Sequence, residues 1–391
     1  MDLASLTQTW TYPTKIHFSC GSSKKIGVFC EEAEILKPLV VVDHQLIKNN
    51  LINPVINSLI TYKIPFELFT EFEENPTDES VSNGLKSFRK NNHDGLIAIG
   101  GGSTIDLAKA IAFMDAQSRP IFDFEDRFDW WRRANSKGIR RVIAIPTTAG
   151  TGSEVGRAAV IKDTKDLKKK LVFHPNMLPV IAILDAELTI ELPKQITAAT
   201  GIDALVHNLE SYLAPGYHPI ADGVALEGLK LIKNNIEKAF QNGDNLNARC
   251  AMLVGSTMGA IAFQKGLGGI HALSHPIGSL LNSHHGLTNA ILLRYVLAYN
   301  YTEVLEQLAC IARYLNLEGG EPKSLVEWLI NLLETLEMPN KLSSLGVDET
   351  HIPELTKMAI NDQAAASNPR PLEASIVSSI YNDALQGKFK L

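Results

Sequence analysis

Short apolar runs alternate with helical patterns along the first half of the chain. The runs are rich in valine, isoleucine and leucine and cover residues 38–43, 65–69, 95–100, 141–146 and 180–185. Apolar runs of this length, separated by amphipathic segments, are typical of buried strands that alternate with helices. This order predicts a parallel sheet with helices packed on it, which is an α/β domain.

Longer helical patterns replace the strands after Asp185. Apolar residues recur at helical spacing over residues 198–214, 218–240, 245–263 and 285–300. A polar segment that ends at Pro193 separates the two kinds of pattern, and such a segment is typical of a link between domains. We therefore predict an N-terminal α/β domain over residues 1–187 and an all-helical C-terminal domain over residues 188–391.

Composition and charge exclude several classes of protein. Of the 391 residues, 45% are hydrophobic and 20% are charged, which is the composition of a globular chain and not of a disordered one. The net charge is −6, and the longest basic run is the short one at residues 168–170. We therefore expect no nucleic-acid partner.

The sequence also bears on cellular location. No apolar run reaches the roughly 18 residues needed to cross a bilayer, and the first ten residues carry no signal-peptide pattern. The four cysteines lack the spacing of a zinc knuckle or a disulfide framework. We expect a cytoplasmic protein with free thiols and no membrane contact.

Two glycine-rich turns each follow a predicted strand. In GGGSTIDLAKA, residues 100–110, the glycines stand between a strand and a helix, where backbone N–H groups can approach a phosphate. Close packing of the strand against the helix is the alternative reason for these glycines. In PTTAGTGSEV, residues 146–155, hydroxyl side chains either line a nucleotide or bond to their own backbone. Two such turns in one α/β domain favour a dinucleotide cleft.

Asp43 follows directly after the first apolar run. A carboxylate at this strand end can accept hydrogen bonds from ribose hydroxyls and repels a 2′-phosphate, which favours NAD over NADP. The alternative is that Asp43 only caps the next helix.

Four of the eleven histidines, at positions 271, 275, 284 and 285, fall within fifteen residues. His271 and His275 are four residues apart, as are Asp203 and His207, so each pair shares one face of a helix. A single histidine is more often a satisfied polar residue, but two such pairs on apolar helices indicate a common ligand. The set suited to one Fe(II) or Zn(II) ion consists of Asp203, His207, His271 and His285.

These segments together resemble the iron-containing alcohol dehydrogenase family. The similarity rests on GGGSTIDLAKA, PTTAGTGSEV, AATGIDALVHNLESYL, HALSHPIG, HHGLTNAILL and NDQAAASNPRP, in this order. It implies an α/β nucleotide-binding domain, an all-helical metal-binding domain and an active site between them. It also implies hydride transfer between a nicotinamide cofactor and a small alcohol or aldehyde that a bound metal polarises. A homo-oligomer, expected to be a dimer, is implied as well.

The resemblance also implies roles for single residues. The metal ligands would be Asp203, His207, His271 and His285, with His284 a neighbour that has no role. His275 would relay a proton near the nicotinamide. The pair formed by Asp106 and Lys109 would support the cofactor loops. Contacts to the cofactor would come from Asp43, Gly101, Gly102, Ser103, Thr147, Thr148, Thr151 and Lys169.

Two segments depart from the family pattern. FQKGLGGIH, residues 263–271, is one residue shorter and carries Lys265. We expect this lysine either to attract an anionic substrate beside the metal or to lie at the surface. FEDRFDWWRRAN, residues 124–135, is an aromatic, arginine-rich insert that either shapes a substrate entrance or packs as an exposed loop.

Two other functions fit parts of this pattern. A lyase of the dehydroquinate synthase kind shares the two-domain plan, NAD and a metal, but uses NAD only transiently. A nucleotide- or metal-sensing module would bind NAD without catalysis. Net turnover of the cofactor distinguishes a dehydrogenase from both.

Overall fold

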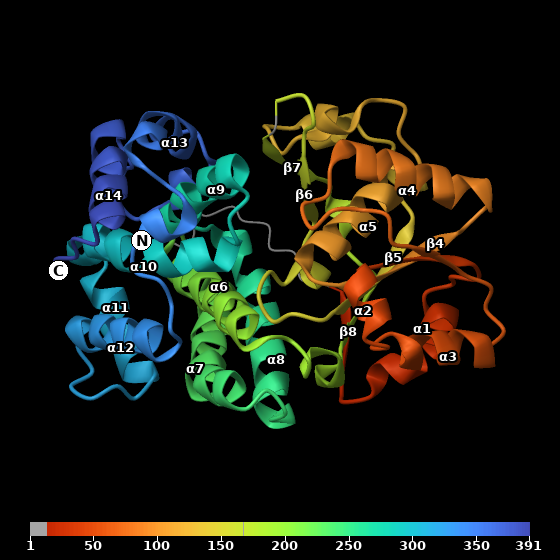
Figure 1. Ribbon diagram of the computed structural model, residues 1–391, viewed down its shortest axis with the longest axis horizontal. Coiled ribbons are helices and arrows are strands. Elements are labelled where there is room, and N and C mark those ends of the chain that lie inside the picture. Colours follow the sequence, from red (N-terminus) through yellow and green to blue (C-terminus); the bar gives the residue numbers. More distant parts are fainter. Residues whose placement is uncertain (1–13, 167) are drawn as a thin grey trace.

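The first half of the chain forms a parallel six-stranded sheet (Figure 1). The structure is a computed structural model that describes residues 14–166 and 168–391. The first ten residues, in which we expected no signal peptide, lie outside the described residues. The strand order is β1-β8-β5-β4-β2-β3, and every pair is parallel. The strands are β1 (Lys15–Phe18), β2 (Pro38–Val42), β3 (Glu67–Phe69), β4 (Gly95–Gly100), β5 (Arg141–Pro146) and β8 (Ile181–Leu184).

All five apolar runs of the first half are strands of this sheet, which confirms the predicted α/β class. Successive side chains of a strand point to opposite faces. Val41 and Ala98 thus join the core on one face, while Val42 and Ile99 join the core on the other. A sheet that is covered on both faces needs apolar residues at every position, and this explains the continuous runs.

Helices cover both faces of the sheet. The helices α4 and α5 pack on one face, and α1 and α3 pack on the other. A fifth short helix, α2, follows β2 directly. The bounds are α1 (Ile26–Glu32), α2 (His44–Lys48), α3 (Asn53–Thr61), α4 (Asp78–Lys90) and α5 (Gly102–Met114).

An antiparallel hairpin that the sequence analysis did not predict extends from the sheet half. It consists of β6 (Ala158–Lys162) and β7 (Lys169–Phe173). The apolar runs in both strands are short: residues 158–161 in β6, two of them alanines, and residues 171–173 in β7, which begins with two lysines.

In the described residues every element of regular structure after β8 is helical, as predicted. The predicted domain boundary at residue 187 lies between β8 and α6, and it stays a prediction. The helices are α6 (Lys194–Leu213), α7 (Pro219–Gln241), α8 (Leu246–Ala262), α9 (Gly269–Leu281), α10 (His285–Asn300), α11 (Leu305–Tyr314), α12 (Pro322–Thr335), α13 (Ile352–Ala359) and α14 (Ala374–Gln386).

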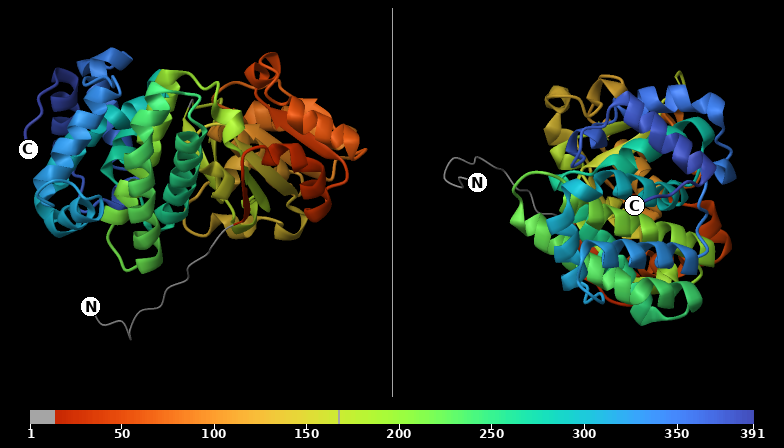
Figure 2. Two further views of the ribbon diagram at one scale, coloured as in Figure 1. Left: turned by 90° about the horizontal axis from the view of Figure 1, so that it is seen from below. Right: turned by 90° about the vertical axis from the view of Figure 1, so that its left-hand side faces the viewer.

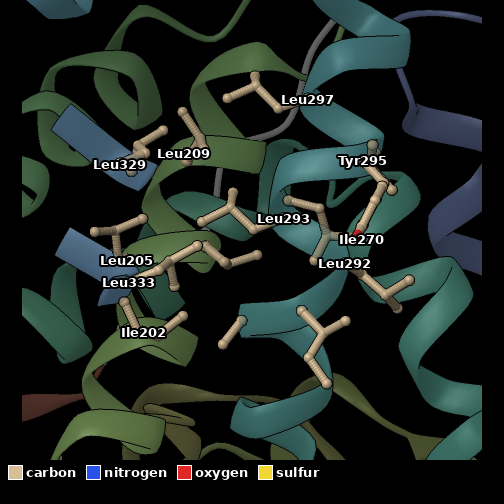
Figure 3. Close-up of a cluster of buried hydrophobic side chains, with 14 of the residues drawn as sticks. Ile202, Leu205, Leu209, Ile270, Leu292, Leu293, Tyr295, Leu297, Leu329 and Leu333 are labelled. Atoms are coloured by element: carbon tan, nitrogen blue, oxygen red, sulfur yellow. The ribbon is translucent and has the colours of Figure 1, made fainter. Parts of the chain in front are cut away.

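The core of the helical half lies between α6, α10 and α12 (Figure 3). Leu205 and Leu209 of α6 are four residues apart and face Leu293 of α10 and Leu329 of α12. Side chains of α6 are buried on almost all sides, because this helix also packs against α7 and α8. A helix buried in this way holds any polar side chain that it carries in a fixed place.

One helical segment of the described chain, Leu246–Lys265, has the length and hydropathy of a membrane span. Within the fold, 56% of its most apolar window is buried. The segment contains α8, which packs against α6 and α7 of the same half. Its apolar residues therefore belong to the core between these helices.

Candidate active-site cleft

A cleft of about 1740 Å³ lies between the sheet half and the helical half, which stand side by side in Figure 2. Residues from both halves line it. On the sheet side it lies at the carboxyl ends of β2, β4 and β5, where parallel sheets commonly bind ligands. The cleft is lined by every residue for which we predicted a cofactor, metal or proton-relay role.

The two glycine-rich turns lie next to each other at this sheet edge. Gly100 ends β4 and pairs in register with Pro146, which ends β5. A methyl group at Gly102 would lie 2.8 Å from Cβ of Thr151, closer than real Cβ atoms approach. The glycine therefore allows α5 to begin directly beside the second turn, and its role in binding a phosphate stays a prediction.

Asp43 stands where the sequence places it, after β2 and at the edge of the cleft. Its Oδ1 atom accepts a hydrogen bond from the backbone N–H of Gln45 at 2.7 Å, which caps α2. The capping alternative is therefore confirmed. The cap engages one carboxylate oxygen, and the residue still lines the cleft.

The buried pair formed by Asp106 and Lys109 connects α5 to the second turn. Lys109 Nζ lies 3.0 Å from Asp106 Oδ1 and donates to the backbone carbonyls of Ser153 and Ala158. Asp106 in turn accepts from the Ser153 hydroxyl at 2.5 Å and from the Val160 backbone at 2.9 Å. This network fixes the turn and the start of the hairpin against α5.

Asp203 and three histidines meet on the helical side of the cleft. One ligand atom each of Asp203, His207 and His271 lies within 4.8 Å of the others. The Nε2 atoms of His207 and His271 both lie 3.8 Å from Asp203 Oδ1, and that of His285 lies 3.4 Å away. Three helices contribute to this cluster, α6, α9 and α10, and only tertiary packing brings them together.

The other ring nitrogen of two of these histidines is already engaged. Nδ1 of His207 lies 3.2 Å from the backbone carbonyl of Gly150, a residue of the second glycine turn. Nδ1 of His271 lies 2.6 Å from Oε2 of Glu210. In both rings Nε2 therefore remains to face Asp203.

The charge state of the cluster suits a divalent cation. Burial lowers the pKa of His271 and of His285 well below the ordinary value, so both rings are neutral at neutral pH and offer a lone pair. Nε2 of His271 is fully buried and forms no hydrogen bond with any described residue. A buried nitrogen without a partner is costly unless something else binds it. The donor set thus fits one transition-metal ion.

His275 forms a second dyad next to this cluster. Its Nδ1 atom lies 2.9 Å from Oδ2 of Asp362, and its ring stacks on that of His285. Burial lowers the pKa of His275, but the Asp362 carboxylate outweighs burial and holds the pKa above its ordinary value. Sequence reasoning missed Asp362 as a partner, although the residue lies within NDQAAASNPRP, the segment that carried the resemblance.

Sequence reasoning also missed Glu210 and Asn289. Asn289 Nδ2 donates to Asp203 Oδ1 at 2.9 Å and lies 3.2 Å from His285 Nε2. Both residues were within reach of a spacing argument. Glu210 follows His207 by three positions and Asn289 follows His285 by four, so each shares a helix face with a ligand candidate.

Lys169 of β7 also lines the cleft. Burial and the neighbouring Lys162 ammonium lower the pKa of Lys169. The charge of Lys169 in turn acts on His275 and His284, so the side chain lies near the histidine cluster. His284 caps the start of α10 through its backbone and lines the cleft beside His285.

The hypothesis that Lys265 attracts an anionic substrate is wrong. Its Nζ atom lies 2.5 Å from Oδ1 of Asp222 and donates to the backbone carbonyl of Tyr212 at 3.2 Å. The lysine side chain is 6% exposed, so the surface alternative is wrong as well. Lys265 is absent from the residues that line the cleft, although Gln264 and Gly266 beside it are present.

The aromatic insert divides between the two predicted roles. Trp130 lines the cleft, and the guanidinium of Arg133 lies 4.3 Å from its ring centroid. Trp131 packs instead against Phe173 and His174 at the base of the hairpin. One tryptophan thus borders the cleft while its neighbour anchors the loop.

Comparisons with known proteins cover nearly the whole chain. A model of iron-containing alcohol dehydrogenases matches residues 13–186, and a model of the C-terminal region of the Fe-containing alcohol dehydrogenase family matches residues 197–385. A 4-hydroxybutyrate dehydrogenase from Cupriavidus necator is 35% identical over 374 residues, which are 93% of this chain and 96% of that protein. An NAD-dependent methanol dehydrogenase from Bacillus methanolicus is 34% identical with the same coverage.

A solved structure agrees with these matches. The crystal structure of a 1,3-propanediol oxidoreductase has a TM-score of 0.92 and 30% identity, and the match covers 97% of this chain and 100% of that one. Both family models describe dehydrogenases, which favours this class over the lyase and the sensing module. The chain therefore belongs to the iron-containing alcohol dehydrogenase family and is an NAD(P)-linked oxidoreductase of alcohols and aldehydes.

Proposed function

We propose that this enzyme prefers NAD and holds one divalent ion, Fe(II) or Zn(II), through Asp203, His207, His271 and His285. The observation that carries the proposal is the buried Nε2 atom of His271, which has no hydrogen-bond partner among the described residues and lies 3.8 Å from Asp203 Oδ1. When bound, such an ion polarises the oxygen of an alcohol or a carbonyl group. The protein then has to position the substrate, the cofactor and one proton.

The sheet side of the cleft would hold the cofactor. Gly101, Gly102 and Ser103 begin α5, where backbone N–H groups and the helix dipole favour the diphosphate. Thr147, Thr148 and Thr151 would lie beside the nicotinamide, because Gly150 of the same turn contacts His207. Asp43 and Lys169 would bind ribose hydroxyls. The Asp43 carboxylate would repel a 2′-phosphate, which is the basis for proposing NAD.

The histidine dyad would handle the proton. Oxidation of an alcohol sends a hydride from the carbinol carbon to C4 of the nicotinamide, and the hydroxyl proton must leave as well. Nδ1 of His275 is engaged by Asp362, so Nε2 is the atom that can accept this proton and pass it on. In the reduction of an aldehyde the same atom would supply the proton.

The substrate would be a small alcohol or aldehyde, since the similar proteins named above act on 4-hydroxybutyrate, methanol and 1,3-propanediol. Assembly as a homodimer and a cytoplasmic location are part of the proposal, and they rest on the family resemblance alone.

The test is metal analysis combined with turnover. His271→Ala should lose the bound ion and the activity, whereas His284→Ala should keep the ion. The parent protein, loaded anaerobically with iron or with zinc, should oxidise NADH in step with loss of an aldehyde. Full metal occupancy in His271→Ala would contradict the assignment of His271 as a metal ligand. Catalysis without net NADH consumption would point to the lyase instead.

A further inference from the structure

Glu210 is a buried carboxylate that none of the assigned roles uses. It lies in α6, three residues after His207, and is 5% exposed. One oxygen, Oε2, accepts from the backbone of Gly268 at 3.0 Å and lies 2.6 Å from Nδ1 of His271. The other oxygen, Oε1, accepts from the backbone of Ile270 at 2.6 Å. Burial raises the pKa of Glu210 to about 7, while the backbone donors act in the opposite direction.

These contacts determine which nitrogen of His271 carries the proton. Backbone N–H groups only donate, so both oxygens of Glu210 act as acceptors. An ionised Glu210 has no proton to give, so in that state His271 donates through Nδ1, which leaves the lone pair on Nε2. Nε2 is the atom that faces Asp203. With the proton on Nε2, the same ring could not bind a metal through that atom.

Glu210 also holds the first turn of α9 in place. The N-cap residue of this helix is Gly268, which has no side chain that could satisfy the first N–H groups. Glu210 satisfies those of Gly268 and Ile270, and Asn368 Oδ1 accepts from Gly269 at 2.9 Å. The helix that carries His271 therefore begins at a position set by α6, the helix that carries Asp203 and His207.

We propose that Glu210 is a positioning residue of the metal centre: it fixes the tautomer of His271 and the distance between α9 and α6. This inference rests on the proposed ligand role of His271. A carboxylate behind a ligating histidine typically contributes 10- to 100-fold in metal affinity.

The decisive variant is Glu210→Gln, which keeps the size of the side chain. One of the two oxygens becomes an NH2 group. It either faces Nδ1 of His271 and favours the proton on Nε2, or opposes the backbone N–H of Ile270 and disturbs the start of α9. We expect the dissociation constant of Zn(II), measured by competition with a chelator, to rise about 10- to 100-fold. The dissociation constant of NADH should stay within about twofold of the parent value.

The matched control is Glu154→Gln. Glu154 is as buried as Glu210, but its carboxylate accepts from the hydroxyl of Thr257 at 2.7 Å and contacts none of the histidines. The Glu154→Gln variant should therefore have the same dissociation constant for Zn(II) as the parent protein. If His271→Ala loses zinc while Glu210→Gln binds it like the parent, this inference fails and the proposed function survives. If His271→Ala keeps zinc, the ligand role of His271 in the proposed function is wrong, and the inference about Glu210 fails with it.

A second measurement needs no variant. The nitrogen chemical shifts of a histidine distinguish the two neutral tautomers. In the metal-free parent protein we expect His271 to carry its proton on Nδ1, and His271→Ala assigns the signal. A proton on Nε2 would overturn the inference even if Glu210→Gln did not fold.

A pair of cysteines supports an independent inference. Sγ of Cys20 lies 3.6 Å from Sγ of Cys250, and 230 positions separate the two residues. Cys20 follows β1 in the sheet half and is exposed, whereas Cys250 lies in α8 of the helical half. Burial, aided by the neighbouring Cys20 thiol, raises the pKa of Cys250. The two free thiols meet across the junction of the two halves.

We infer that Cys20 and Cys250 form a site of oxidative modification by peroxides. The Cys20 sulfur attacks hydrogen peroxide and becomes a sulfenic acid, with release of one water. The Cys250 sulfur then displaces the hydroxyl group, which leaves as a second water, and an S–S bond forms. Two thiols and one peroxide thus give one disulfide and two waters, and the sulfurs need to approach from 3.6 Å to about 2.05 Å.

This disulfide would join the sheet half to α8, the helix that also contacts the turn at residues 146–155. α8 already contacts that turn, since Ser256 donates to the carbonyl of Gly150 at 3.0 Å and Thr257 donates to Glu154. A covalent link at Cys250 would therefore restrict motion between the halves.

The test is oxidation of the full-length protein with hydrogen peroxide. We expect the thiol count in denaturant to fall from four to two, with a cross-linked peptide that joins Cys20 and Cys250 within one chain. Cys20→Ser and Cys250→Ser should each abolish the cross-link, whereas Cys310→Ser should keep it. An unchanged thiol count, or a link that only joins two chains, would overturn the inference.

Discussion

Nδ1 of His275 lies 2.9 Å from Oδ2 of Asp362, a residue 87 positions further along the chain. The next residue, Gln363, donates through its side chain to the backbone carbonyl of Asp126 in the sheet half. The segment that follows α13 therefore orients the histidine and contacts the opposite wall of the cleft. The position of His275 depends on both halves.

Asp362→Asn should lower kcat without loss of the metal. The amide keeps the size of the carboxylate but removes the charge that favours a protonated ring, so His275 becomes a weaker proton acceptor. We expect kcat to fall about 10-fold or more, with metal content and NADH affinity close to the parent values. Steady-state kinetics and metal analysis on one preparation test this. An unchanged kcat would contradict the claim that the charge of Asp362 assists proton transfer at His275.

Asp43→Asn should narrow the preference for NADH over NADPH. Asparagine is as good an N-cap as aspartate, so the contact to Gln45 and the start of α2 should survive. Only the charge is lost, and its repulsion of a 2′-phosphate is worth about 1–3 kcal/mol, or roughly 5- to 150-fold in selectivity.

The measurement is kcat/KM for both cofactors, with thermal unfolding as the control for the cap. If the parent already favours NADPH, the role assigned to Asp43 is incorrect.

Lys265→Met should reduce stability and leave substrate charge selectivity unchanged. The ammonium is buried and paired with Asp222, which is 32% exposed on its side chain. Removal of the cation leaves a partly buried carboxylate without a partner. We expect a loss of about 1–3 kcal/mol in the free energy of unfolding.

Urea unfolding of Lys265→Met, Asp222→Asn and the double variant gives the coupling between the two residues. The ratio of kcat/KM for a neutral aldehyde and its ω-carboxylate analogue should match that of the parent. A fall in kcat/KM for the carboxylate analogue alone would instead support the hypothesis that Lys265 attracts an anionic substrate.

The sequence predicted those elements whose pattern of residue types lies within a few neighbouring positions of the chain. The strands β2 and β4 are continuous apolar runs because both sheet faces are covered. Asp203 and His207 share a helix face by spacing alone. The hairpin strands β6 and β7 were not predicted, because their apolar runs are short and their order comes from pairing with each other and from the packing of β6 on α5.

Spacing could have placed Glu210 beside His207, but its pairing with His271 could not be predicted, for a related reason. Glu210 and His271 are 61 positions apart, and no periodicity links them. Lys265 lies close in sequence to His271, yet α7 brings Asp222 to it. Proximity along the chain was misleading here, because the fold places Lys265 against Asp222 and His271 in the metal-binding cluster.

Gly102→Ala should weaken binding of the cofactor. A methyl group on Gly102 would lie 2.8 Å and 2.9 Å from Cβ and Cγ2 of Thr151, so the two cofactor turns would have to separate. The turns start from neighbouring strands that are paired at Gly100 and Pro146, which leaves little freedom to adjust. We expect the dissociation constant of NADH to rise about 10-fold or more, which equals about 1.4 kcal/mol.

Gly223→Ala provides the matched control. Gly223 lies exposed in α7, and apart from its chain neighbours and the nearby backbone of that helix, no atom of the described residues lies within 4 Å of the added methyl group. Alanine there should stabilise the helix by about 0.5–1 kcal/mol and leave NADH binding unchanged. NADH titration followed by fluorescence, with thermal unfolding of both variants, separates a local effect on the cleft from a general effect of the substitution. If Gly102→Ala folds with parent stability and binds NADH as the parent does, the cofactor does not depend on the close contact between these two turns.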